Sequence, residues 1–458
     1  MVEGRTYRPV IQPERCHTCD VCLRGCPAEF IPEYRKEEKS LRGTLYGGKT
    51  KRRSSIPLPP CQDACPIQQD TKGYVALVAK GKFKEALELI REVNPLPAVC
   101  GFICHHPCEE ACLRTEVDEP IPIRLLKRFV AEYERNETRP LRRLKKKRRE
   151  KILVIGSGPA GLTAANDLRL LGFGVTVFEA LPVSGGMLRV GIPEFRLPRD
   201  ILQMEIDGIR ALGVEIRTRH RFLLEEKNGR GLRKLGFQAA FLSIGAHQSL
   251  SLNIPGEKLQ GVLSGVEFLR ETSLGKKFRI GKRVAVIGGG NVAVDVGRSA
   301  LRLGGEEVQL FCIESEKEMP AIPGELAESK QEGVRINTLV SPLRIVGKRG
   351  KVIGMELVRL NSGRMDERGK IEIVPVEGSN FRVEADQIIT AIGQRVDRIG
   401  LKGFETNPNG TIRIDPETGE TSINGVFAGG DAVTGPAWAI DAIAAGKKGA
   451  KAIDRYLS

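Results

Sequence analysis

Four cysteines near the start of the chain have the type and spacing to hold a metal cluster. Cys16, Cys19, Cys22 and Cys26, the last followed by proline, form the run C-x2-C-x2-C-x3-C-P. In bacterial ferredoxins this run supplies thiolate ligands to [4Fe–4S] clusters. A zinc site is the alternative, but soft thiolates at this spacing favour iron–sulfur chemistry. The run therefore predicts a [4Fe–4S] cluster.

Six further cysteines lie between residues 61 and 112, and only Cys312 lies beyond them. The six are Cys61, Cys65, Cys100, Cys104, Cys108 and Cys112. A secreted disulfide framework would need an export signal, which the N-terminal residues do not show, so this crowding indicates metal or cluster ligation. No stretch approaches the roughly 18 apolar residues of a membrane span. We therefore expect a cytoplasmic protein without a membrane span, in which Cys312 belongs to a hydrophobic core.

Glycines in a strand–turn–helix pattern predict a first dinucleotide site. Gly156, Gly158 and Gly161 form G-x-G-x-x-G between an apolar run and a helical pattern. The first glycine permits the turn, the second lets the backbone approach a pyrophosphate, and the third lets the helix pack on the strand. The start of that helix offers unpaired N–H groups to the phosphates. Glu179 ends the next strand, where a carboxylate can bind a ribose hydroxyl.

The same order of elements recurs in the second half of the chain. Gly288, Gly290 and Ala293 again lie between a strand pattern and a helix pattern, and Glu314 ends the following strand. Alanine in the third position is an accepted variant of this fingerprint. Two such units in one chain predict two nucleotide sites.

Three longer segments carry a resemblance to a known family. Residues 184–202 read SGGMLRVGIPEFRLPRDIL, residues 319–321 read MPA, and residues 425–447 read GVFAGGDAVTGPAWAIDAIAAGK. With the two glycine motifs, they make the chain similar, from residue 60 to its end, to the flavoprotein class of the glutamate synthase small subunit. Related chains occur in ferredoxin-dependent transhydrogenases and dihydropyrimidine dehydrogenase.

The resemblance implies FAD in the first nucleotide unit and NAD(P)H in the second. It also implies that the NAD(P)H-binding domain is inserted into the FAD-binding domain. Four further residues are assigned to cofactor binding on this ground, namely Gly186, Arg196, Gly430 and Asp431. Asp431 would lie beside the ribityl–phosphate part of the flavin.

The residues at the end of the second strand bear on the choice of nicotinamide. NADPH-using members of the family carry an arginine pair here, because a 2′-phosphate calls for guanidinium groups. This chain has Ile313 and Glu314 in that register. Glu314 would accept a hydrogen bond from a 2′-hydroxyl and repel a 2′-phosphate. We therefore expect NADH, with NADPH left open because Lys317 lies nearby in the sequence.

The family places two [4Fe–4S] clusters in an N-terminal helical domain, between the flavin and the partner. By the resemblance, one cluster uses Cys65, Cys104 and Cys108, with a carboxamide or carboxylate as fourth ligand at the position of Lys127. Because an ammonium group cannot ligate a metal, Cys100 is the natural replacement.

Cys61 and Cys112 are then left for a second cluster. The C-x2-C that the family has just before Cys61 is missing. The N-terminal cysteine run could donate the missing ligands, since in two-cluster ferredoxins the Cys-Pro cysteine serves the other cluster. Ten cysteines therefore support two clusters, and a third stays open.

The elements that must position these residues imply an α/β protein of several domains. A chain of 458 residues exceeds the roughly 250–300 residues that one hydrophobic core holds. Apolar residues at helical spacing predict two short helices within 73–94, interrupted at Gly81, and another within 121–136. We expect two Rossmann-like domains in a glutathione-reductase-like arrangement, preceded by an α-helical iron–sulfur domain. The expected divisions are a ferredoxin-like motif and linker (1–60), the helical iron–sulfur domain (61–138), a basic linker (139–150), the first part of the FAD-binding domain (151–264), the NAD(P)H-binding domain (265–385) and the second part of the FAD-binding domain (386–458).

The formal net charge of +15 is concentrated in the basic run 139–151. No groove-reading or RNA-binding motif accompanies this run, so it is interpreted as a solvated linker or as a docking surface for an acidic protein partner. A basic iron–sulfur nucleic-acid-binding protein is the rival of a different class, but it would leave both nucleotide sites unused. We expect no nucleic acid.

These observations predict an NAD(P)H-dependent FAD iron–sulfur oxidoreductase. Electrons would pass from NADH, or NADPH, through FAD and the clusters to a partner subunit or ferredoxin. The alternative within this class is the glutamate synthase small subunit itself, which would need a separate large subunit to form glutamate. No C-x-x-C lies beside the flavin unit, which argues against disulfide reduction.

Overall fold

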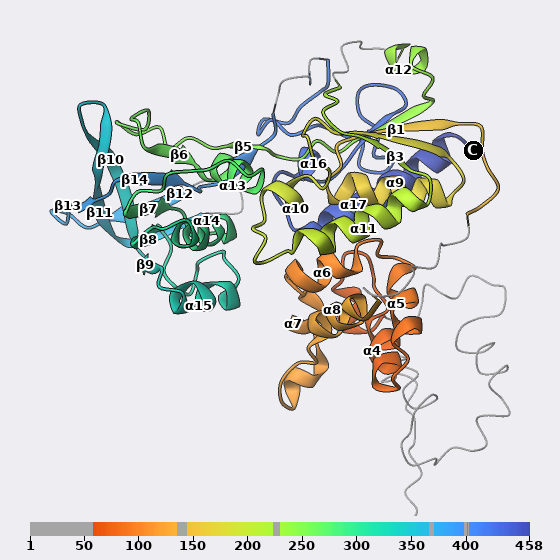
Figure 1. Cartoon of the computed structure of the whole chain (residues 1–458), viewed down its shortest axis with the longest axis horizontal. Coiled ribbons are helices and arrows are strands. Elements are labelled where there is room, and N and C mark those ends of the chain that lie inside the picture. Colours follow the sequence, from red (N-terminus) through yellow and green to blue (C-terminus); the bar gives the residue numbers. More distant parts are fainter. Residues whose placement is uncertain (1–57, 135–143, 223–229, 366–370, 398–400, 402) are drawn as a thin grey trace, which may run out of the picture. The chain divides into compact units, whose positions relative to one another are not determined.

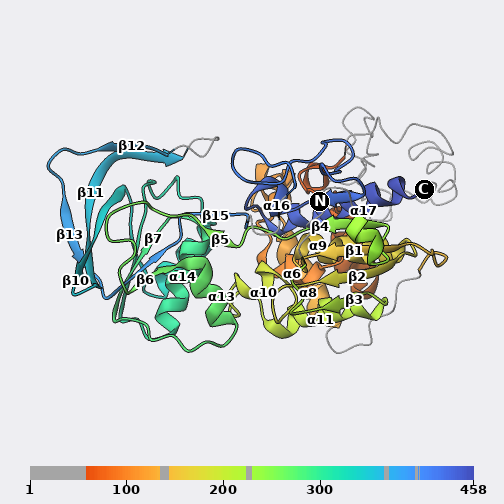
Figure 2. The same ribbon diagram turned by 90° about the horizontal axis from the view of Figure 1, so that it is seen from above.

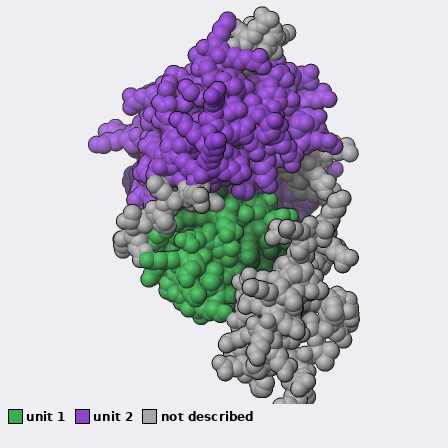
Figure 3. Space-filling view, turned by 90° about the vertical axis from the view of Figure 1, so that its right-hand side faces the viewer, with its two compact units in different colours: residues 1–138 green, residues 139–458 purple. Residues whose placement is uncertain are grey.

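The computed structural model describes residues 58–134, 144–222, 230–365, 371–397, 401 and 403–458. The chain divides into two compact units, residues 1–138 and 139–458 (Figure 3). The ferredoxin-like cysteine run at 16–26 lies outside the described residues. Among the described residues, no helix is long and apolar enough to cross a membrane.

The described part of the first unit consists of short helices (Figure 1). They are α3 (Pro60–Asp63), α4 (Thr71–Ala79), α5 (Phe83–Arg91), α6 (Pro97–Ile103), α7 (Pro107–Glu110), the 3₁₀-helix η4 (Leu113–Glu116) and α8 (Ile123–Tyr133). The two helices predicted on either side of Gly81 are confirmed as α4 and α5, and the third is confirmed as α8. Proline begins α6 and α7, where its missing N–H has no helical partner to lose.

The second unit begins with a five-stranded parallel sheet in the order β16-β4-β1-β2-β3. Its strands are β1 (Lys151–Ile155), β2 (Gly174–Phe178), β3 (Glu215–Arg217), β4 (Ala239–Leu242) and β16 (Val426–Ala428). The helices of this half are α9 (Pro159–Leu170), α10 (Met187–Val190), α11 (Arg199–Ala211), α12 (Arg230–Lys234), α16 (Asp431–Thr434) and α17 (Ala439–Tyr456). Helix α17 lies directly on α9, since a Cβ at Gly446 would be 2.3 Å from the carbonyl oxygen of Ala160. Because β16 comes from the end of the chain, the chain leaves this sheet and later returns to it.

Between these visits the chain forms a second parallel sheet in the order β6-β14-β7-β8-β9. Its strands are β6 (Val262–Ser264), β7 (Arg283–Ile287), β8 (Glu307–Phe311), β9 (Arg335–Asn337) and β14 (Gln387–Thr390), and its helices are α13 (Gly265–Ser273), α14 (Asn291–Arg302) and α15 (Pro323–Gln331). Antiparallel strands β10 (Val340–Lys348), β11 (Lys351–Met365), β12 (Ile371–Pro375) and β13 (Phe381–Glu384) complete this half. The predicted α/β class with two Rossmann-like units is confirmed.

The two connections between the sheets pair with each other. Strand β5 (Gln248–Ser249) leads out of the first half, β15 (Gln394–Arg395) leads back, and the two run antiparallel. Figure 2 shows this pair, labelled β5 and β15, between the two sheets of the second unit. The inserted half therefore begins and ends at one narrow crossing, with β6 and β14 just outside the predicted range 265–385.

Candidate cofactor sites

The first glycine loop lies between β1 and α9, and its three glycines meet different surroundings. Gly156 has φ +100°, and a Cβ there would lie 2.3 Å from the carbonyl oxygen of Ser243. A Cβ at Gly161 would lie 1.9 Å from the carbonyl oxygen of Gly156. At Gly158, in contrast, φ is −69° and no atom of the chain lies within 4 Å of a Cβ. A side chain at Gly156 or Gly161 would therefore collide with the backbone of the chain, whereas a side chain at Gly158 would enter open space.

Side chains around this loop hold it to the end of β2. One carboxylate oxygen of Glu179 accepts hydrogen bonds from the Ser157 backbone N–H at 3.0 Å and from the Ser157 hydroxyl at 2.5 Å. The other oxygen accepts from the backbone N–H of Leu181 at 2.8 Å. The same hydroxyl of Ser157 accepts a hydrogen bond from the N–H of Gly185 at 3.0 Å. Glu179 therefore orders the loop, and its binding to a ribose hydroxyl stays a prediction. Ser157 was not among the predicted residues, although it occupies a variable position inside the fingerprint.

Two segments far away in the sequence also reach this loop. Gly186 has φ +55°, and a Cβ there would lie 2.7 Å from the Cα of Gly158. Gly430 has φ +68° and begins α16, with its added Cβ 3.0 Å from the Cβ of Ala160. Asp431 follows it, and burial raises the pKa of its carboxyl group to about 6.

The structure thus brings three predicted segments together at the start of α9. The space in front of Gly158 and the N-terminus of α9 suit a pyrophosphate, which is the group that FAD would present there. The residues therefore fit FAD.

Arg196 is placed differently from the other predicted flavin residues. Its guanidinium group binds Asp295 of α14 at 2.8 Å and Glu325 of α15 at 2.8 Å. Both of these helices belong to the inserted half. The assignment of Arg196 to a cofactor stays a prediction, and the group as described serves a contact between the two halves of the unit.

The second glycine loop repeats the geometry of the first. Gly288 has φ +141°, and a Cβ there would lie 2.4 Å from the carbonyl oxygen of Ala391. A Cβ at Gly290 would meet nothing closer than Pro320, at 4.0 Å. Ala293 is fully buried in the core of this half. The side chain of Asn291 accepts a hydrogen bond from the backbone N–H of Ile322, which ties the loop to the segment that follows the MPA motif.

Glu314 lies beside this loop, and one of its carboxylate oxygens has no hydrogen-bond partner. The residue is only 9% exposed, and its Oε2 is buried without a hydrogen-bond partner. A Cβ at Gly289 would lie 2.7 Å from that oxygen. Burial raises the pKa of Glu314 above its usual range. A ribose hydroxyl would satisfy this oxygen, so the site fits a dinucleotide. Cys312, two residues earlier, is buried in the core as expected.

The six described cysteines of the first unit form no disulfide bond. Five are buried, and Cys61 is partly exposed. Burial raises the pKa of Cys108 to about 12, opposed by Lys127 and supported by Cys104 and Cys65. Burial also raises the pKa of Cys61, and Cys112 adds to that rise.

These interactions relate the thiols to one another and to the buried Lys127. Cys65, Cys104 and Cys108 lie close enough to influence one another beside the buried Lys127, and Cys100 also acts on Lys127. Among the described residues, no group of three or more His, Cys, Asp or Glu side chains converges as around a single metal ion. A cubane takes thiolates at separate corners, and the buried sulfurs of this unit are the kind of donor that a [4Fe–4S] cluster uses. The partition of ligands stays a prediction, and the cysteines at 16–26 lie outside the described residues.

Comparison with known proteins adds to this geometry. The family model described as pyridine nucleotide-disulphide oxidoreductase matches residues 150–446. The model described as dihydropyrimidine dehydrogenase domain II, 4Fe-4S cluster, matches residues 34–139. The boundary between the two matches falls in the basic run that was predicted as a linker.

Two curated relatives and one solved structure illustrate the likeness. The beta subunit of the NADP(+)-dependent formate dehydrogenase of Moorella thermoacetica is 42% identical over 424 residues, which cover 87% of this chain and 60% of that one. The small chain of the NADPH glutamate synthase of Escherichia coli is 32% identical over 426 residues, which cover 87% of this chain and 89% of that one. The structure of Mycobacterium tuberculosis FprA in complex with NADPH has a TM-score of 0.55 over 68% of this chain and 85% of that one, at 21% identity, which is a likeness of fold. The chain spans less than two thirds of the formate dehydrogenase subunit.

Proposed function

This chain belongs to the pyridine nucleotide-disulphide oxidoreductase family, and on this premise we propose that it carries electrons from NAD(P)H to a separate protein subunit. The observation that carries the proposal is that one chain contains both glycine loops, each with space for a dinucleotide, and a helical unit with buried cysteines. Bound FAD exchanges electron pairs with a nicotinamide and single electrons with clusters, and the chain supplies position and insulation. The relatives described above are named as subunits or chains of larger enzymes, which supports a protein partner.

We propose NADH as the electron donor. Support comes from the buried oxygen of Glu314 next to Gly289, which has no hydrogen-bond partner. A carboxylate there would accept a hydrogen bond from the ribose 2′-hydroxyl of NADH and would repel the 2′-phosphate of NADPH. The Moorella relative is named for NADP(+), and this cofactor is that of the relative. NADPH would need a cation near the ribose, and the exposed Lys317 is the candidate.

The partner is proposed to be acidic, because the chain carries a formal charge of +15. A second candidate function is that of the glutamate synthase small subunit, which the coverage of 89% of the Escherichia coli chain favours. In that case the partner is the glutamate-forming large subunit. Without a partner, the chain should form no glutamate from glutamine and 2-oxoglutarate.

The proposal is tested on protein purified without oxygen. We expect one FAD and about eight irons per chain, on the premise of two cubanes. NADH should bleach the flavin absorbance and support reduction of ferricyanide. Fewer than about four irons after reconstitution would contradict the cluster assignment. A flavin that neither NADH nor NADPH bleaches would contradict the proposed electron flow.

A further inference from the structure

The connection between the two halves of the second unit is narrow. Among the described residues, the strands that pair at the crossing are β5 and β15, of two residues each. A crossing of two short segments acts as a hinge, since a few φ/ψ changes there rotate everything beyond it. A contact away from the hinge is therefore needed to fix the angle between the two halves, and so between their glycine loops.

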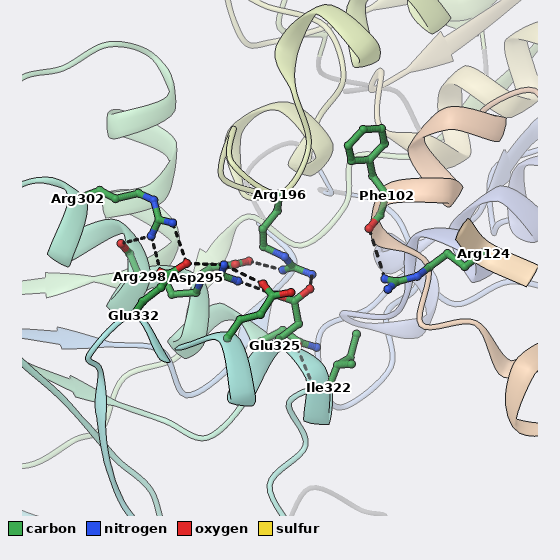
Figure 4. Close-up of polar contacts among 11 residues, drawn as sticks. Phe102, Arg124, Arg196, Asp295, Arg298, Arg302, Ile322, Glu325 and Glu332 are labelled. Carbon is green, nitrogen blue, oxygen red and sulfur yellow. Dashed lines mark hydrogen bonds and ion pairs between the residues drawn. The ribbon is translucent and has the colours of Figure 1, made fainter. Parts of the chain in front are cut away.

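Arg196 makes such a contact. Its Nη1 binds Oδ2 of Asp295 at 2.8 Å, and its Nη2 binds Oε1 of Glu325 at 2.8 Å. Figure 4 shows the guanidinium group of Arg196 directed at these two carboxylates. All three side chains are largely buried, with 9%, 5% and 13% exposed. A buried guanidinium group that bridges carboxylates on two helices fixes both position and orientation.

The loop that carries Arg196 is itself held rigidly. The backbone N–H groups of Arg196 and Leu197 both donate to the carbonyl oxygen of Pro193, and Leu197 is fully buried. Arg199 donates to the carbonyl oxygens of Leu188 and Ile192. The arginine is therefore presented by a fixed turn of the FAD-binding half.

On the other side, the receiving residues belong to a charged network of the inserted half. Glu325 also accepts from Arg298 at 2.9 Å, and Arg298 in turn binds Glu332 at 2.8 Å. The ring of Phe195, next to Arg196, lies 3.9 Å from the guanidinium carbon of Arg302. Two consecutive residues of one half thus engage this network. A hydrogen bond from Arg199 to the Ser273 hydroxyl at 3.1 Å is a further link between the halves.

The position of Asp295 makes this contact relevant to the nucleotide. Asp295 lies in the second turn of α14, whose first turn follows Gly290 and would face the phosphates of a bound dinucleotide. Gly186, on the segment that leads to Arg196, lies against Gly158 of the first loop. We propose that Arg196 is a positioning residue that sets the angle of the NAD(P)H-binding half against the FAD-binding half, and so the approach of the nicotinamide to the flavin. This inference rests on the proposed function.

The test compares two variants of Arg196 with a matched control. Arg196→Gln removes the bridge, Arg196→Lys keeps a charge that can bind one carboxylate, and Arg344→Gln breaks a pair with Glu356 inside the inserted half. At saturating NADH, we expect flavin reduction in stopped flow to slow at least tenfold in Arg196→Gln, to slow less in Arg196→Lys, and to stay within twofold of wild type in Arg344→Gln. The dissociation constant for NAD⁺ should stay within twofold in all three, because the glycine loops are unchanged. Hydrogen–deuterium exchange of the holoenzyme should rise in 191–198 and at the start of α14 only in the Arg196 variants.

Several outcomes would overturn the inference. Unchanged reduction in Arg196→Gln would show that the bridge does not position the nicotinamide. A loss confined to NAD⁺ affinity would make Arg196 a binding residue, and an equal loss in Arg344→Gln would make the effect a general one of a lost ion pair. If Arg196→Gln does not fold, Glu325→Gln and Arg196→Lys test the same bridge. A wild-type protein whose flavin neither NADH nor NADPH bleaches would instead contradict the proposed function.

Discussion

Glu314 is the residue on which nicotinamide preference should turn. An ionised carboxylate gains a hydrogen bond from a 2′-hydroxyl but repels a 2′-phosphate and loses that partner. A polar mismatch of this kind changes kcat/KM by roughly ten- to a thousandfold, in favour of NADH. Changing Ile313 and Glu314 together to arginine should reverse the order, because guanidinium groups suit phosphate. Steady-state dye reduction with each nucleotide measures both. Equal or better use of NADPH by the wild type would refute this, and Lys317→Ala would then be the next variant to measure.

Gly158 tests whether the first loop holds FAD. Its φ of −69° is open to any residue, and a Cβ there meets no atom of the chain. Gly158→Ala should therefore leave the thermal stability of FAD-free protein unchanged, while it weakens FAD retention by roughly tenfold or more, because the methyl group takes the space of a pyrophosphate. Gly161→Ala is the contrasting variant, since its Cβ would collide with the Gly156 carbonyl oxygen and should impair folding. Full FAD retention in Gly158→Ala would place the flavin elsewhere.

The local part of these sites follows from the sequence, and the long-range part does not. The spacing of Gly156, Gly158 and Gly161 marks a strand–turn–helix in the sequence, although the close approach of Ser243 to Gly156 does not follow from it. The approach of Gly186 to Gly158, and the bridge from Arg196 to Asp295, join residues that no local pattern relates. The same reason explains why Arg196 was assigned to a cofactor by resemblance, whereas its partners in the structure belong to the inserted half.

At the level of elements, periodicity predicts well wherever an element buries one face. Helices α4, α5 and α8 and both strand–helix–strand units fall where the apolar pattern places them. The antiparallel layer β10 to β13 was not predicted. Strand β10 is only partly buried and β13 alternates between intermediate and exposed positions, so their register depends on distant partners rather than on a strong local signal.

Ion pairs connect α14 to the end of α15 in the inserted half, and their contribution to stability should depend on pH. Hydrogen bonds from Arg302 and Arg298 lower the pKa of Glu332 to about 2, below its ordinary value of 4.5. Its carboxylate therefore stabilises the fold above pH 4.5, and this contribution is lost as the pH falls toward 2. Glu332→Gln should lower the Tm at pH 7 by roughly 2–6 °C, and the difference from wild type should shrink below pH 4.5.

Release of FAD fluorescence on heating measures this transition in the second unit alone. Glu328→Gln is the matched control, since Glu328 also binds Arg298 but its side chain is 60% exposed. Exposed pairs contribute little, so the control should shift the Tm by less than Glu332→Gln. A pH-independent loss in Glu332→Gln would show that the pair with the arginines is not the source of the effect.

For the whole molecule, the formal charge of +15 should govern the encounter with its partner. FAD and two clusters would subtract only about six charges, so the holoprotein stays positive. A single-sign field speeds association with a partner of opposite sign, and salt screens it over about 10 Å at 0.1 M. Reduction of an acidic ferredoxin by NADH through this chain should therefore slow by roughly tenfold between 0.02 and 0.3 M NaCl. Reduction of a neutral quinone, measured in parallel, should change little, because no field steers it. If ferredoxin reduction does not depend on salt while both proteins remain folded, the basic charge plays no part in docking, and the run at 139–151 is a solvated linker.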